Sequence, residues 1–207
     1  MSTRYVVRYD DSERINHWIT ALLFVLAALS GLAAFHPAFF FFTDFFGGGT
    51  WTRILHPFLG CALFLAFLAL GARFWRQNLI NDGDREWMRA SGALLRGEKS
   101  DLPPVGKYNA GQKVVFWISV IAIVVLLVTG ITFWQPWFAD DFPVTLRRFA
   151  VLLHALAAFV LILAIIAHVY AAIWVKGTVR AMTRGTVSEA WARQNHPLWF
   201  KDMTGGK

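Results

Sequence analysis

Residues 149–175 read FAVLLHALAAFVLILAIIAHVYAAIWV, an apolar run of 27 residues. It contains no Asp, Glu, Lys or Arg, and it contains two histidines. A helix of this length can cross the roughly 30 Å of hydrocarbon in a bilayer. His154 and His168 are fourteen residues apart, so on such a helix they lie within about 40° of one face and about 21 Å apart along the axis. The stretch therefore predicts a membrane span with one histidine near each surface.

Three further stretches have the length and apolar character of a membrane span. They cover about residues 15–35, 54–74 and 114–134. Over the whole chain, 57% of the 207 residues are hydrophobic and only 16% are charged, a composition that excludes an ordinary soluble domain. The sequence thus predicts an all-α integral membrane four-helix bundle, with residues 1–207 forming a single membrane domain.

The basic residues are distributed unevenly between the two sides of the predicted bundle. Of the 20 Lys and Arg residues, three precede the first span, eight lie from Arg73 to Lys113 and six lie from Lys176 onward. Because basic loops stay on the cytoplasmic side, both termini, the loop 75–113 and the tail 176–207 are predicted to be cytoplasmic. The net charge of +7 then reflects membrane topology, and no nucleic-acid partner is expected.

The chain contains one cysteine, Cys61, which lies inside an apolar run. One cysteine forms no intrachain disulfide, no cysteine-rich zinc or iron-sulfur site and no C-x-x-C-H attachment site for haem. Any haem in this chain would therefore be held without a covalent bond.

Four of the six histidines lie within the predicted spans, where ionisable side chains are costly and usually functional. His17 lies near the inner end of the first span, and His56 lies near the outer end of the second. Matching depths pair His17 with His168 toward the cytoplasm and His56 with His154 toward the outside. Two axial imidazoles fill both open positions of a haem iron, so each pair predicts a haem that carries electrons.

The remaining histidines, His36 and His196, each precede a proline and have no partner at a matching depth. We interpret both as interfacial or loop residues. Two further groups are compatible with a haem site and equally with ordinary packing or flanking charge: the glycines of the spans and the arginines of the outer ends. They are Gly31, Gly60, Gly71 and Gly130, and Arg53, Arg147 and Arg148.

The segment GKYNAGQK, residues 106–113, immediately precedes the third span on the cytoplasmic side. Asn, Gln, Lys, Tyr and free backbone N–H groups can donate hydrogen bonds to the carbonyl oxygens of a quinone. The same residue types are also typical of a polar turn that caps a helix. The residues alone leave both interpretations open.

Six motifs spread over nearly the whole chain carry a resemblance to one protein family. They are NHW at 16–18, RILHPF at 53–58, VGKYNAGQK at 105–113, LLVTG at 126–130, WVKG at 174–177 and HPLW at 196–199. The nine-residue motif at 105–113 is the most specific. With these motifs the chain resembles the gamma subunit, cytochrome b556, of membrane-bound respiratory formate dehydrogenases that contain molybdenum or tungsten.

The resemblance implies a dihaem cytochrome b. By position in the motifs, His56 and His154 are the axial ligands of a periplasmic haem b, and His17 and His168 are the axial ligands of a cytoplasmic one. These assignments agree with the pairing by depth.

The resemblance also implies a menaquinone site, with ubiquinone as the other candidate, that involves Asn109, Gly111 and Gln112. Its implied partners are an iron-sulfur beta subunit and a catalytic alpha subunit in the bacterial inner membrane. Electrons would pass from the beta subunit through the outer and then the inner haem to quinone, which takes its protons from the cytoplasm during anaerobic respiration.

Three alternatives stay open from the sequence. The first is the cytochrome b subunit of a membrane-bound hydrogenase or thiosulfate reductase, and the second is a self-contained cytochrome b without a catalytic partner. The third is a transporter whose histidines relay protons or bind a metal ion. Against the third, the spans contain almost no carboxylates, and the histidines form two distant pairs rather than one chain or cluster.

Overall fold

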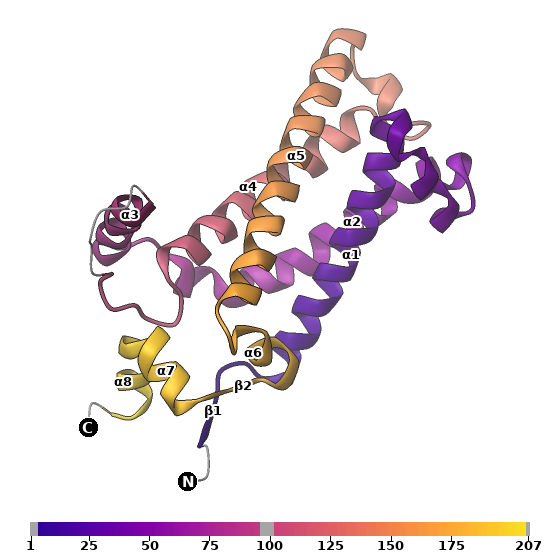
Figure 1. Cartoon of the computed structure of the whole chain (residues 1–207). Helices are drawn as coiled ribbons and strands as arrows, with labels where there is room; N and C mark the ends of the chain where they lie inside the picture. The colour runs from indigo at the N-terminus through magenta and orange to yellow at the C-terminus, as the bar shows by residue number, and fades with distance from the viewer. Residues whose placement is uncertain (1–3, 96–101, 206–207) are drawn as a thin grey trace. The chain divides into compact units, whose positions relative to one another are not determined.

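The computed structural model describes residues 4–95 and 102–205. Within these ranges, four helices are long and apolar enough to cross a membrane. They are α1 (Asp11–Phe35), α2 (Gly49–Phe74), α4 (Ala110–Thr132) and α5 (Val144–Trp174) (Figure 1). The predicted all-α membrane protein with four spans is thereby confirmed.

Each spanning helix begins four or five residues before the apolar stretch that predicted it. In α1 the added first turn carries Asp11 and Glu13. Acidic side chains are favourable there because the unpaired N–H groups give a helix N-terminus a partial positive charge. Hydropathy alone misses such turns because they are polar.

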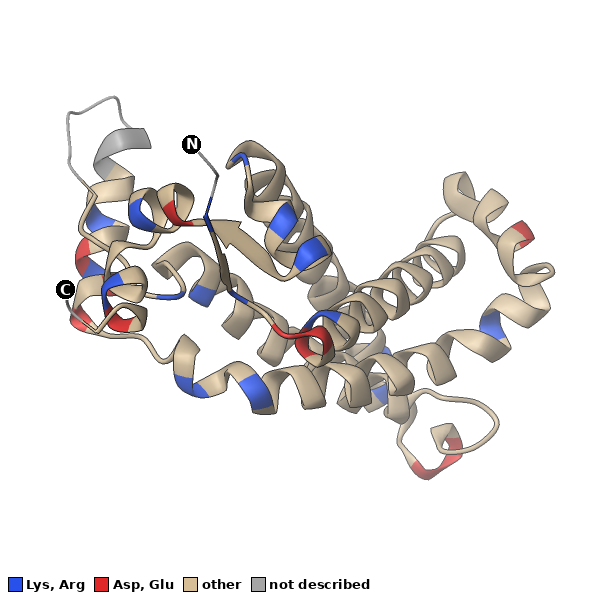
Figure 2. Ribbon diagram, turned by 90° about the horizontal axis from the view of Figure 1, so that it is seen from below, with Lys and Arg blue, Asp and Glu red and all other residues tan. Residues whose placement is uncertain are grey.

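Short elements connect the spans. They are η1 (Pro37–Phe46), η2 (Trp75–Asn78), α3 (Asp82–Leu95) and η3 (Ala139–Asp141), and after α5 come α6 (Thr178–Arg184), β2 (Thr186–Ser188), α7 (Glu189–Asn195) and α8 (Pro197–Met203). Among the described residues, the Lys and Arg positions of the four spanning helices all lie close to a helix end, and others lie on the short elements, for example on α3 and α6. Figure 2 marks the Lys and Arg positions in blue.

The described chain divides into two compact units, so the single membrane domain expected for residues 1–207 stays a prediction. One unit comprises residues 15–72 and 118–166 and contains most of the four spans. Its buried centre is formed by Ala122, Ile123 and Leu161. The phenylalanines 24, 64 and 67 pack against that centre. Many large apolar side chains of the same helices stay exposed, for example Leu152 at 69%, as expected for surfaces that face lipid.

The other unit comprises residues 1–14, 73–117 and 167–207. In it, β1 (Tyr5–Val7) pairs antiparallel with β2, with Val6 opposite Val187. Val187 is 1% exposed and Ala192 of α7 is fully buried, so the tail folds back onto the N-terminal strand. This unit also holds the segment that the sequence singled out for quinone.

Candidate haem-binding site and quinone segment

The two outer histidines face each other within the unit that contains most of the spans. His56 comes from α2 and His154 from α5, with ring centroids 6.2 Å apart and ring planes inclined by 70°. A metal ion bound by one nitrogen of each imidazole, with bonds of about 2 Å, places the two centroids roughly 6 Å apart. The spacing of this pair therefore fits an iron atom held by both rings.

Hydroxyl groups on two other helices hold the far nitrogens of these rings. His56 Nδ1 lies 2.8 Å from Ser30 Oγ of α1, and His154 Nδ1 lies 2.9 Å from Thr129 Oγ1 of α4. Each hydroxyl donates its own proton back to a carbonyl of its helix, at 2.9 Å to Leu26 for Ser30 and at 2.6 Å to Val125 for Thr129.

The direction of these hydrogen bonds fixes the tautomer of both imidazoles. A hydroxyl that donates to a backbone carbonyl can only accept from the ring, so Nδ1 carries the proton in both histidines. Nε2 then keeps its lone pair, which is the form that binds a metal. Both rings thus have the tautomer that the predicted haem iron would need.

Glycines next to these hydroxyls give the rings room. A Cβ atom at Gly31 would lie 3.1 Å from Cε1 of His56, and one at Gly130 would lie 3.4 Å from Cε1 of His154. Gly60 and Gly71 differ, because a Cβ atom there would meet no described atom within 4 Å. Of the four glycines considered in the sequence, two therefore lie against the predicted ligands.

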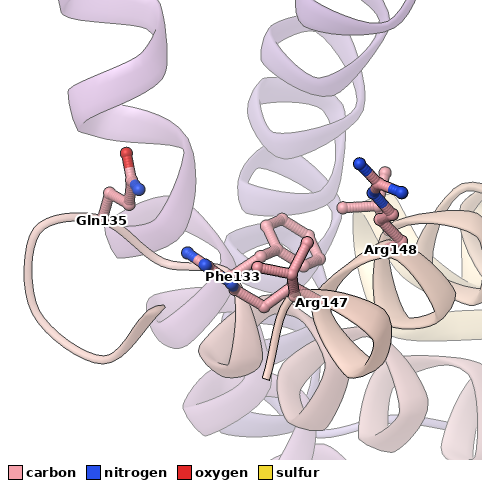
Figure 3. A pocket seen from close by; sticks show the side chains of 6 residues that line it. Phe133, Gln135, Arg147 and Arg148 are labelled. Carbon is pink, nitrogen blue, oxygen red and sulfur yellow. The ribbon is translucent and has the colours of Figure 1, made fainter. Parts of the chain in front are cut away.

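An open hollow of about 400 Å³ lies at the end of the same unit that the basic residues predict to face outward. Its lining comprises Phe133, Gln135, Val144, Arg147, Arg148 and Val151 (Figure 3). Phe133 also meets the His154 ring edge-on at 5.2 Å. Arg147 pairs with Asp140 at 3.6 Å, and that carboxylate is 89% exposed, so the pair holds Arg147 only weakly. Two guanidinium groups thus come from the first turns of α5, the helix that also carries His154.

The two histidines predicted near the cytoplasmic surface, His17 and His168, belong to different compact units. His17 lies in α1 and meets the Trp18 ring edge-on at 5.4 Å. His168 lies in α5, in the other unit. Their pairing around a second haem stays the prediction made from matching depths.

The predicted quinone residues form a helix cap at the start of α4. The backbone N–H of Gln112 donates to Asn109 Oδ1 at 2.9 Å, and the backbone N–H of Asn109 donates to Gln112 Oε1 at 3.0 Å. This is a reciprocal capping box, the structural alternative that the sequence left open. The cap uses only the two carbonyl oxygens, so the amide nitrogen of each side chain is not consumed by it. Gly111 lies between them, against the Trp87 ring.

A buried ion pair that the sequence did not predict holds the end of this segment. Lys113 Nζ lies 2.7 Å from Asp84 Oδ2 of α3 and donates to the Leu79 carbonyl at 3.0 Å. The two side chains are only 7% and 8% exposed. Such a desolvated pair fixes the position of α4 against α3.

Aromatic rings surround the cation that precedes the cap. Lys107 Nζ lies 5.1 Å from the centroid of Tyr9, 5.7 Å from that of Phe74 and 5.9 Å from that of Tyr108. Burial lowers the pKa of Lys107, and burial together with the neighbouring Tyr9 raises the pKa of Tyr108. Lys107 is thus a cation with a weakened hold on its proton, next to the capping segment.

The two remaining histidines lie outside the predicted haem pairs. His36 caps η1, where its Nδ1 accepts from the Ala38 N–H at 3.1 Å. His196 lies between α7 and α8, as a loop residue should, but it is 4% exposed and hydrogen-bonded on both ring nitrogens. The sequence interpretation placed His196 correctly and missed its contacts.

Comparison with known proteins gives the family. Residues 8–185 match the family described as prokaryotic cytochrome b561. The chain belongs to this cytochrome b561 family. Its relatives include the cytochrome b556(fdo) subunit of formate dehydrogenase from Escherichia coli K12, which is 45% identical over 198 residues that cover 96% of this chain and 93% of the relative.

Two further relatives of this cytochrome b561 chain have similar names. The cytochrome b556(Fdn) subunit of the nitrate-inducible formate dehydrogenase from the same strain is 41% identical, over 97% of this chain and 93% of that protein. The formate dehydrogenase cytochrome b556 subunit of Haemophilus influenzae is 36% identical, over 95% of this chain and 83% of that protein. The resemblance drawn from the motifs is therefore confirmed, and the family implies that the chain is an integral membrane cytochrome that holds haem b.

Proposed function

We propose that this chain is the electron-transfer and quinone-reducing subunit of a formate dehydrogenase in the bacterial inner membrane. The facing pair of His56 and His154 is the observation that carries the proposal. The names of the relatives support formate dehydrogenase as the enzyme, since all three are called formate dehydrogenase cytochrome b556 subunits.

At the outer site, His56 and His154 would hold one haem b, which supplies one-electron redox chemistry when bound. Held by an imidazole from each histidine, such a haem would carry electrons rather than bind oxygen or substrate. Ser30 and Thr129 keep both rings in the tautomer and orientation that bind iron, so little needs to move when the iron enters or changes its charge.

A second haem b would be held by His17 and His168 toward the cytoplasm. The argument is the depth of each residue in its span, with His17 three residues after Arg14 and His168 eight before Lys176. Two haems about 21 Å apart along α5 would connect the two membrane surfaces.

Quinone, either menaquinone or ubiquinone, would bind beside the inner haem at Asn109, Gly111 and Gln112. The capping box occupies the oxygens of Asn109 and Gln112, so each side-chain amide nitrogen can donate toward a quinone carbonyl. The N–H groups of the first turn of α4 add further donors. Lys107, with its lowered pKa, is suited to pass a proton to the reduced quinone.

Both termini, the loop 75–113 and the tail 176–207 would face the cytoplasm, as the basic residues predict. The periplasmic end would then receive electrons from an iron-sulfur beta subunit, which in turn takes them from a catalytic alpha subunit that oxidises formate. Because electrons would move inward while quinone takes protons from the cytoplasm, the reaction would build a membrane potential.

The test is to purify the complex in mild detergent, count extractable haem per chain and record reduced-minus-oxidised spectra before and after formate. We expect two haems, about one in a variant that lacks any single axial histidine, such as His56→Ala or His17→Ala. His36→Ala is the matched control, because this histidine lies at the outer end and caps η1. Absence of haem from the wild-type chain would refute the proposal. Haem that formate does not reduce, but that hydrogen reduces or thiosulfate reoxidises, would refute the enzyme assignment.

A further inference from the structure

Three successive carbonyls of the segment before α4 are each held by a donor from a terminus of the chain. The Val105 carbonyl accepts from the Leu198 N–H at 3.2 Å, and the Gly106 carbonyl accepts from His196 Nδ1 at 2.7 Å. The Lys107 carbonyl accepts from the guanidinium of Arg8. We call these three contacts the carbonyl clamp. It lies wholly within the unit that holds residues 1–14, 73–117 and 167–207.

The clamp fixes the protonation of its central histidine. A carbonyl only accepts, so Nδ1 of His196 carries the proton, and Nε2 lies 3.2 Å from a nitrogen of Arg8, which only donates. Burial and the neighbouring Arg8 lower the pKa of His196 to about 4. The imidazole is therefore neutral near pH 7 and joins the segment before α4 to the N-terminal strand.

Arg8 is itself held rigidly. It is 5% exposed, and its guanidinium lies 4.7 Å from the ring centroid of Trp199 and 5.3 Å from that of Trp191. Its backbone N–H donates to the Gly185 carbonyl at 2.8 Å, directly beyond the β1–β2 pair. The faces of two indoles and a two-stranded sheet thus set where the Arg8 donor points.

The clamp ends two residues before Asn109, and the ion pair of Lys113 with Asp84 holds the opposite end of the same segment. The residues between these anchors are the ones to which the proposed function assigns quinone. A segment fixed at both ends presents its donors without further ordering when a ligand binds, and affinity rises because that cost is avoided.

We propose that His196 and Arg8 are positioning residues for quinone, which act by holding the carbonyls of Gly106 and Lys107 so that the start of α4 keeps its donors in place. The inference rests on the proposed quinone site. Neither residue needs to touch the quinone, so their loss should weaken binding of quinone far more than it slows turnover at saturating quinone.

Two conservative substitutions separate the contacts of His196. His196→Asn keeps a side-chain N–H near the position of Nδ1, so it can still donate to Gly106, but it is too short to reach Arg8. His196→Gln places its amide near the position of Nε2, so it can accept from Arg8 but loses Gly106. Leu198→Pro removes the N–H that bonds Val105, together with a leucine side chain that is 44% exposed, and proline is tolerated in the first turn of α8. Lys201→Ala, at an exposed position of α8, is the matched control.

The experiment uses the full purified complex and two readouts that do not depend on turnover. Hydrogen exchange of residues 102–112 reports whether the clamp is open, and titration with a fluorescent hydroxyquinoline N-oxide, a quinone analogue, gives its Kd. Steady-state assays with menadione then give KM and kcat. We expect His196→Gln and Leu198→Pro to speed exchange and to raise both Kd and KM on the order of tenfold, with kcat and haem content unchanged. His196→Asn should stay closer to the wild type, and Lys201→Ala should match it.

The outcomes separate the two proposals. If the wild-type complex neither binds the analogue nor reduces menadione, the quinone site itself is wrong and the clamp has nothing to position. If the wild type binds the analogue but His196→Gln and Leu198→Pro bind it equally well despite faster exchange, the positioning role is wrong and the quinone site stands. Loss of haem in both variants would show that the clamp supports folding instead, which also overturns the proposal.

Discussion

Replacing Ser30 by alanine tests whether the hydroxyl behind His56 prepares that ring for iron. The substitution removes the hydroxyl that lies 2.8 Å from His56 Nδ1, at a position of α1 that is fully buried. A buried N–H that loses its acceptor costs about 1–3 kcal/mol, and loss of the hydrogen bond behind a metal-binding histidine weakens metal binding by about 10- to 100-fold. We therefore expect the outer haem to be held on the order of tenfold more weakly.

The assay follows transfer of haem from the purified complex to excess apomyoglobin, which reports how fast each site releases its haem. In Ser30→Ala, one of the two haems should leave faster, and the other should leave at the wild-type rate. The midpoint potential of the outer haem should also rise. An imidazole that no longer donates through Nδ1 is a poorer electron donor, so it stabilises the oxidised iron less.

Ser30→Thr is the matched control, because a threonine hydroxyl already serves His154 in the same way at Thr129. It should keep the wild-type rate and potential. Equal haem release from the alanine and threonine variants, with the same potential in both, would refute the idea that the hydroxyl orients the ligand.

Three further predictions follow from the described contacts. Gly31→Leu should displace the His56 ring and lower the haem content, measured by pyridine haemochrome assay, from two to about one per chain. Gly31→Ala, whose Cβ would lie 3.1 Å from the ring, should retain most of the haem. Asp84→Ala should destabilise the chain by about 3–5 kcal/mol in thermal denaturation, and removing Lys113 as well should restore much of that loss. The pKa of His196 falls from 6.5 to about 4 on folding, so its contribution to stability is complete above pH 6.5 and declines as the pH falls toward 4. Protection factors of the tail amides, which compare each exchange rate with the intrinsic rate at the same pH, should therefore be smaller at pH 5 than at pH 7. Equal protection factors at pH 5 and pH 7 would contradict this last expectation.

The spans and the depths of their histidines could be predicted because both depend on spacing along one helix. Apolar runs locate the helices, and fourteen residues between His154 and His168 place the two at opposite surfaces. The pairing of His56 with His154 needs only that both lie near the same surface. The structure brings these two rings within 6.2 Å of each other.

The contacts behind the ligands could not be read from the sequence. A serine or threonine in an apolar helix ordinarily bonds the carbonyl of the preceding turn, as Ser30 and Thr129 both do, so it gives no sign of a second partner. Which side of the helix faces a given ring depends on rotation about the helix axis, which span length does not fix. His196 was missed for a different reason, since its partners Arg8 and Gly106 are 188 and 90 residues away in the sequence.

The outer site nevertheless contains a pattern that links sequence to chemistry. Ser30-Gly31 in α1 and Thr129-Gly130 in α4 are both a hydroxyl residue followed by glycine, and each pair meets one ligand. The hydroxyl accepts from Nδ1 while the glycine leaves space at Cε1, so a single helix turn sets both the tautomer and the position of a ring carried by another helix. Either function alone would be incomplete, because a ring with room but no acceptor can rotate, and a ring with an acceptor but no room is pushed aside. The two predicted ligands of the outer site thus contact residues on the two spans that carry no predicted outer ligand, so all four spans would contribute to one haem.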